Sequence, residues 1–211
     1  MTTLDIISDP ICPWCYIGKT KLDRALKEAP DQPFDITWRP FQLNPDMPVE
    51  GMDRHIYLEL KFGGRAGAMQ AYKPIVEAAE AMGLDIAFDK ITRTPNTLNA
   101  HRLILWAKVQ SCQELVVTEL FTRYFQAGQD ISDPEVLLDI ASAAGMEPDM
   151  TRRLLESDAD LQETILEDRK ARAMGIQGVP CFIVGATHVL NGAQDTQLWG
   201  DVIREISTKS A

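Results

Sequence analysis

The 211-residue sequence has few of the side chains that usually hold metal ions, with only four cysteines and three histidines. A structural zinc site needs four ligands, commonly supplied as two closely spaced pairs. The sequence contains one such pair, whereas Cys112 and Cys181 are isolated and the histidines are scattered. The composition therefore argues against a metal site.

The sequence also lacks an excess of positive charge, a long apolar run and a secretion signal. Its 31 acidic residues outnumber its 21 basic ones, which gives a net charge of −10 and disfavours binding to nucleic acid or anionic membranes. No run is apolar enough to span a bilayer, and residues 1–5 lack the basic and apolar regions of a signal peptide. We therefore expect a cytoplasmic protein without nucleic-acid or membrane partners.

The one close cysteine pair, Cys12 and Cys15, lies between a predicted strand (residues 5–9) and a predicted helix (residues 13–29). Pro13 suits the first helical position, which makes Cys12 the N-cap. The positive end of the helix dipole favours an anion there, so the Cys12 thiol should ionise more readily than a free thiol. Cys15, one turn later, can attack a mixed disulfide on Cys12 and release the product. This arrangement predicts a thiol–disulfide oxidoreductase. A purely structural disulfide is the other alternative, and such a short loop without a secretion signal argues against it.

The pattern of apolar residues and chain breaks predicts an α/β unit interrupted by a helical block. A further strand at residues 34–43 would complete a parallel β-α-β unit. Six helices are then expected, at residues 52–62, 67–82, 97–110, 113–127, 134–144 and 148–156. The α/β pattern resumes with a helix at residues 159–174, strands at 181–184 and 187–190, and a helix at 194–207. We therefore expect residues 1–43 and 158–211 to form one discontinuous domain around an inserted helical subdomain at residues 44–157.

Several motifs together resemble one branch of the thioredoxin superfamily. They are Cys12-Pro13-Trp14-Cys15-Tyr16-Ile17-Gly18, Lys61-Phe62-Gly63-Gly64, Thr94-Pro95-Asn96-Thr97, Ala100-His101-Arg102-Leu103, Gly178-Val179-Pro180 and Gly192-Ala193-Gln194. The chain is similar to the DsbA-like branch, and within it to FrnE-type proteins, which are mostly cytosolic. This resemblance spans nearly the whole chain. It implies an α/β thioredoxin fold with a large all-helical insertion.

The position of the two thiols makes Cys12 the expected nucleophile and Cys15 the expected resolving thiol. The resemblance assigns roles to further site residues. It implies a cis peptide bond between Val179 and Pro180, facing the cysteines, with the backbone of Val179 offered to a substrate chain. Pro13 and Trp14 would join these two residues in contacting the substrate, and we expect Trp14 to be exposed.

The remaining candidates are predicted to be structural. Cys181 follows Pro180 directly and would be a third thiol near Cys12, but a small buried strand residue is the favoured interpretation. Asp9 is expected to close the first strand as a turn residue. His101 is expected to be a hydrogen-bonded histidine near the core, and Asn96 to be a helix N-cap.

The expected partners are thiol- or disulfide-containing proteins or small molecules, with glutathione as a redox partner and no bound cofactor. A monomer and a homodimer fit the sequence equally well. The resemblance leaves an alternative, because 2-hydroxychromene-2-carboxylate isomerases and kappa-class glutathione transferases are similar in fold. Those enzymes typically carry serine in place of the first cysteine, whereas this chain has Cys12. A glutathione-dependent isomerase or transferase of an aromatic or polyketide-like molecule is therefore the second hypothesis, and a chaperone-like binder the third.

Overall fold

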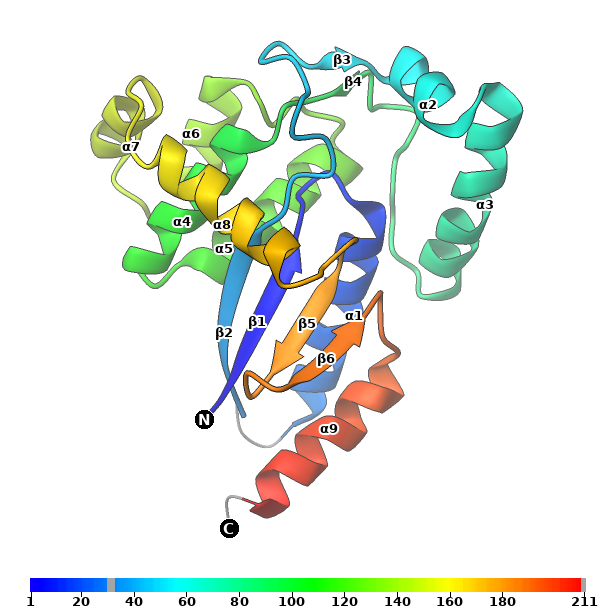
Figure 1. Cartoon of the computed structure of the whole chain (residues 1–211), viewed down its shortest axis with the longest axis vertical. Coiled ribbons are helices and arrows are strands. Elements are labelled where there is room, and N and C mark those ends of the chain that lie inside the picture. Colours follow the sequence, from blue (N-terminus) through cyan, green and yellow to red (C-terminus); the bar gives the residue numbers. More distant parts are fainter. Residues whose placement is uncertain (30–32, 210–211) are drawn as a thin grey trace.

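A mixed four-stranded sheet lies at the centre of the protein, seen in a computed structural model that describes residues 1–29 and 33–209 (Figure 1). Its strands, in the spatial order β2-β1-β5-β6, are β2 (Phe34–Pro40), β1 (Thr2–Ser8), β5 (Cys181–Val184) and β6 (His188–Asn191). β1 is parallel to β2 and antiparallel to β5, and β6 returns antiparallel to β5. The parallel pair requires a crossover, which the first helix provides.

Three helices flank this sheet. They are α1 (Pro13–Glu28), α8 (Leu161–Ala173) and α9 (Thr196–Lys209). In Figure 1, α1 passes behind the sheet and α8 crosses in front of β1 and β2. This is a thioredoxin fold, and it confirms the predicted fold class.

A helical insertion separates β2 from α8. It contains α2 (Arg54–Phe62), α3 (Arg65–Ala81), α4 (Leu98–Val109), α5 (Gln113–Phe121), the π-helix η1 (Thr122–Gln126), α6 (Pro134–Ala143) and α7 (Pro148–Leu155). Figure 1 shows α2 and α3 on one side of α1, and α4–α7 on the other. The domain boundaries at residues 43 and 158 stay a prediction.

The insertion departs from the prediction at two points, so it is not all-helical. The predicted helix at residues 52–62 begins only at Arg54, because Met52–Asp53 (β3) pairs with Arg93–Thr94 (β4) in a short antiparallel ladder. Asp53 then caps α2 by accepting hydrogen bonds from the amides of His55 and Ile56. The second departure is η1, where the predicted helix at 113–127 widens into a π-helix, a feature often found at functional sites.

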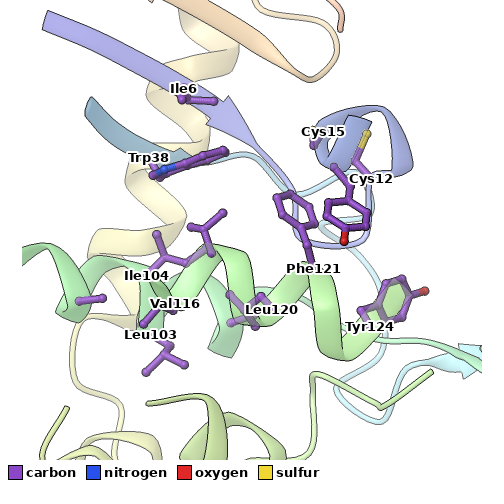
Figure 2. Packing of buried hydrophobic residues seen from close by; sticks show 14 of the residues in the cluster. Ile6, Cys12, Cys15, Trp38, Leu103, Ile104, Val116, Leu120, Phe121 and Tyr124 are labelled. Atoms are coloured by element: carbon purple, nitrogen blue, oxygen red, sulfur yellow. The ribbon is translucent and has the colours of Figure 1, made fainter. Parts of the chain in front are cut away.

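The main hydrophobic core joins the insertion to the helix that carries the two cysteines (Figure 2). Tyr16 of α1 stacks on Phe121 and Phe125, with ring centroids 5.2 and 5.5 Å apart. Trp38 of β2 meets Phe121 edge-on at 6.4 Å. Cys12 and Cys15 belong to the same buried group. The start of α1 therefore rests on α5 and η1.

A second, smaller core lies on the opposite face of the sheet. Successive strand residues point to opposite faces, so Ile6 of β1 faces the main core and Ile7 the smaller one. The smaller core also holds Phe41, Cys181 and Ala171 of α8. No helix in the described part of the chain is both long and apolar enough to cross a membrane.

Candidate active site

The two cysteines lie at the start of α1, directly after β1. Cys12 is the helix N-cap and Pro13 the first helical residue, as the sequence predicts. The Cys12 carbonyl accepts hydrogen bonds from the amides of Cys15 and Tyr16, which begins the helix. The two thiols are hydrogen-bonded to one another. One turn of helix thus holds the pair within reach of a shared disulfide.

The Cys15 thiol resists deprotonation. Cys15 is 1 % exposed, and this burial raises the pKa of its thiol well above its ordinary value. The hydrogen bond to Cys12 and the charge of that neighbour raise the Cys15 pKa further. The neutral thiol form of Cys15 is therefore favoured over its thiolate.

The Gly178-Val179-Pro180 segment lies against Cys12. The Val179–Pro180 peptide bond is cis, as the resemblance implies. The Cys12 thiol donates a hydrogen bond of 3.5 Å to the Val179 carbonyl. The structure thus brings Cys12 and Val179 together; that Pro13, Trp14, Val179 and Pro180 contact substrate stays a prediction.

Asp9 connects the turn before Cys12 to two other parts of the chain. Its carboxylate is fully buried and accepts hydrogen bonds from the amides of Ile11 and Leu43, at 3.4 and 2.7 Å. The His101 Nε2 lies 3.7 Å from the same carboxylate and makes no hydrogen bond among the described residues. Asp9 is therefore the predicted turn residue, and His101 is buried as expected but lacks the expected hydrogen bond at Nε2.

The predicted N-cap at Asn96 is wrong by one residue. The N-cap of α4 is Thr97, and the Asn96 side chain accepts a hydrogen bond from the Leu98 amide. Its amide group also donates to the Met47 carbonyl. Asn96 thus acts at the helix start while it ties two loops together.

A cavity of about 280 Å³ opens beside Cys12, between the start of α1 and the helices α2 and α3. Trp14 lines it and is half-buried against the main core, so the expectation of an exposed Trp14 is wrong. Cys12 and Val179 also line this cavity, whereas Cys15 does not. Only one of the paired thiols therefore faces the space that a substrate can enter.

Sequence reasoning missed the polar side chains of this cavity. Arg54, Tyr72, Thr94 and Tyr124 line it from four separate elements. Arg54 donates hydrogen bonds to the hydroxyls of Tyr124 and Tyr72, at 3.2 and 3.1 Å. Nothing in the sequence distinguishes Arg54 from a surface arginine, because its burial depends on the β3–β4 ladder and on η1.

The other two cysteines lie away from the cavity. Cys181 is fully buried in the smaller core, where burial raises the pKa of its thiol. Cys112 is the half-buried N-cap of α5. Among the residues described, no group of three or more His, Cys, Asp or Glu side chains is placed to hold a metal ion.

Tyr124 should make stability fall at alkaline pH. Burial raises the pKa of its hydroxyl far above the ordinary value of about 10, so the unfolded chain ionises there first. The neutral Tyr124 hydroxyl contributes fully to the free energy of unfolding below about pH 10. Above that pH its contribution falls by up to about 1.4 kcal/mol per pH unit. We expect urea denaturation between about pH 8 and 11 to give a shallower decline for Tyr124→Phe than for the unsubstituted protein. If the free energy of unfolding falls equally steeply with pH in both proteins, the raised pKa of Tyr124 is contradicted.

Comparison with known proteins finds relatives that match nearly the whole chain. YwbO of Bacillus subtilis (strain 168), an uncharacterised protein, is 26 % identical over 208 residues, which is 98 % of either chain. The crystal structure of the probable DsbA oxidoreductase SCO1869 from Streptomyces coelicolor has a TM-score of 0.85 and 25 % identity, covering 99 % of this chain and 91 % of the other.

The cytosolic disulfide reductase DsbM from Pseudomonas aeruginosa, solved with GSH, shares the fold. Its TM-score is 0.68 at 17 % identity, with 99 % of this chain and 98 % of that chain covered. The DSBA-like thioredoxin domain matches residues 3–204. With the fold and the paired cysteines, this match shows that the chain belongs to the DSBA-like thioredoxin domain family.

Proposed function

We propose that this protein is a thiol–disulfide oxidoreductase in which Cys12 is the nucleophile and Cys15 the resolving thiol. The observation that carries the proposal is the asymmetry of the pair. Cys12 faces the cavity at the N-terminus of α1, whereas Cys15 lies behind it with a raised pKa. A nucleophile needs access to substrate, and a resolving thiol needs only access to the nucleophile.

The proposed cycle transfers two electrons. The Cys12 thiolate attacks one sulfur of a disulfide, which forms a mixed disulfide and releases the other sulfur as a thiolate. Cys15 then loses its proton and attacks the Cys12 sulfur, which releases the second substrate thiolate and leaves a Cys12–Cys15 disulfide. The substrate is reduced and the protein oxidised, and the reverse sequence oxidises a dithiol.

The surroundings of Cys12 support substrate positioning in this cycle. The Val179 carbonyl lies against the Cys12 thiol, and Trp14 offers an apolar face at the cavity wall. We propose that Val179 and Pro180 align the substrate backbone while Pro13 and Trp14 contact its side chains.

Glutathione is the proposed redox partner, and the cytoplasm the proposed location. DsbM, which shares the fold, was solved with GSH and is named a cytosolic disulfide reductase. The cavity beside Cys12 is open to a small thiol. No resident cofactor is needed, because the two sulfurs carry both electrons.

A trapping experiment tests the assignment of the two thiols. Cys15→Ser should accumulate a mixed disulfide on Cys12 when it is mixed with a small disulfide, because the resolving step is removed. Cys12→Ser, treated in the same way, should accumulate none. If Cys12→Ser traps the adduct and Cys15→Ser does not, the two roles are reversed.

The alternative is a glutathione-dependent isomerase or transferase acting on an aromatic or polyketide-like molecule. The cavity favours it, because its volume and partly aromatic wall suit a small aromatic ligand. That chemistry needs one thiol at most, so its turnover would survive Cys15→Ser. The disulfide exchange proposed above would not.

A further inference from the structure

We propose that Arg54 forms an anion-binding subsite beside Cys12, and that this subsite takes the carboxylate of a low-molecular-weight disulfide or thiol. The inference rests on the proposed function and narrows its substrate class. Arg54 and Cys12 line the same cavity, Arg54 from the first turn of α2 and Cys12 from the N-terminus of α1.

Among the described residues, no carboxylate neutralises the positive charge of Arg54. Its side chain is 5 % exposed, and no carboxylate of the described residues lies within 4 Å of its guanidinium. Its hydrogen-bond partners are neutral phenols, and the guanidinium carbon lies over the rings of Tyr72 and Phe88 at 5.4 and 5.6 Å. A buried charge without a counterion is costly, and an anionic ligand would remove much of that cost.

The phenols around Arg54 remain neutral. Burial raises the pKa of both Tyr72 and Tyr124, although Arg54 opposes the shift in each. Asp9 is close enough to act on Tyr124, but its two oxygens already accept hydrogen bonds from the Ile11 and Leu43 amides. The positive charge thus stays available to a ligand.

Other groups near Arg54 are donors that lack acceptors. The Thr94 hydroxyl lines the cavity, is buried, and has no hydrogen-bond partner among the described residues. The Tyr72 hydroxyl accepts from Arg54 and donates to no described residue. The unpaired Thr94 hydroxyl beside the cationic Arg54, with Lys61 as a second cation in the lining of the same cavity, matches the oxygens of a carboxylate.

The size and walls of the cavity favour a small ligand. Its volume of about 280 Å³ is near the lower limit of ligand pockets, roughly 300 Å³. Trp14, Phe62 and Ile75 supply apolar surface in the same cavity. A carboxylate held by Arg54 would leave a short carbon chain to carry its sulfur towards Cys12.

Two matched disulfides test this inference. The probes are 3,3′-dithiodipropionate and its uncharged diamide, which share a carbon–sulfur skeleton. The rate at which each oxidises the reduced protein would be followed by thiol alkylation. We expect the diacid to react at least about tenfold faster at low concentration, since charge-assisted bidentate hydrogen bonds to arginine are strong. Equal rates for the two probes would overturn the subsite and leave the proposed function intact.

Variants link that preference to Arg54. Arg54→Met should abolish the preference for the diacid, so that the two probes react at nearly equal rates. Arg153→Met, which removes one exposed arginine of α7, is the charge-matched control and should keep the preference. Thr94→Val leaves Arg54 in place and should reduce the preference for the diacid. This variant tests the subsite if Arg54→Met fails to fold. A preference that persists in both site variants would overturn the inference.

A binding measurement separates the subsite from the redox chemistry. Suberate has the chain length of the diacid but no sulfur, and calorimetry should detect its binding to the reduced protein. We expect Arg54→Met to weaken that binding at least about tenfold. Failure of suberate to bind would overturn the subsite, whereas binding without oxidation by either disulfide would contradict only the proposed function. A preference for acidic groups that appears only with polypeptide disulfides would overturn the small-molecule assignment.

Discussion

Cys12→Ser is expected to lower the rate of disulfide reduction by at least about a thousandfold, because it removes the nucleophile that forms the mixed disulfide. Cys12 is the only one of the four cysteines that lines the cavity within the described residues. Reduction of a small neutral disulfide by the reduced protein, followed by stopped-flow absorbance, measures the effect.

The control for this variant is another cysteine in a structural position. Cys112→Ser places serine, a good N-cap residue, at the start of α5 and should leave the rate within about twofold. An equal fall in rate in both variants would mean that the substitutions disturb the folded structure. Full activity in Cys12→Ser would rule out the proposed nucleophile and favour chemistry that does not use the thiols.

Phe121→Ala is expected to lower the free energy of unfolding by about 3–5 kcal/mol, the usual cost of truncating a buried phenylalanine. Phe121 is 1 % exposed and contacts the rings of Tyr16 and Trp38, so it joins α5 to α1 and to β2 (Figure 2). The loss should also loosen the start of α1. Urea denaturation followed by far-UV circular dichroism measures the first effect, and the alkylation rate of Cys15 the second.

Leu115→Ala is the matched control, because it shortens a side chain of the same helix that is 57 % exposed. It should change the free energy of unfolding by no more than about 0.5 kcal/mol. Equal destabilisation by the two substitutions would mean that the α5–α1 contact does not carry the stability assigned to it.

The sequence was sufficient to predict the secondary structure on either side of the two cysteines. An apolar run, a turn and a proline at the first helical position determine the strand, the N-cap and the helix from local residues alone. The pairing of Cys12 with a late Val-Pro segment followed from the family resemblance, and the structure has the two in contact. The helix predicted at residues 134–144 also begins where expected, at Pro134, and the Asp133 side chain before it accepts a hydrogen bond from the Glu135 amide.

The features that shape the cavity depend on distant contacts, which local patterns cannot reveal. Residues 52–53 read as helix because their partners in β4 are some 40 positions away in the chain. The π-helix η1 is continuous in pattern with α5, yet its widening accompanies the burial of Tyr124. The sequence predicted an exposed Trp14 because its packing against the main core depends on residues distant in the chain. Arg54 was missed for the same reason.

The central claim is that Cys12 and Cys15 form one reversible redox couple. The most direct measurement equilibrates the protein in graded glutathione buffers, alkylates the free thiols and reads each cysteine by mass spectrometry. The account predicts that Cys12 and Cys15 are protected together in one two-electron transition, with a midpoint between about −270 and −120 mV. Cys112 and Cys181 should stay reduced throughout. A stable glutathione adduct on Cys12, or a disulfide between Cys12 and Cys181, would contradict the account.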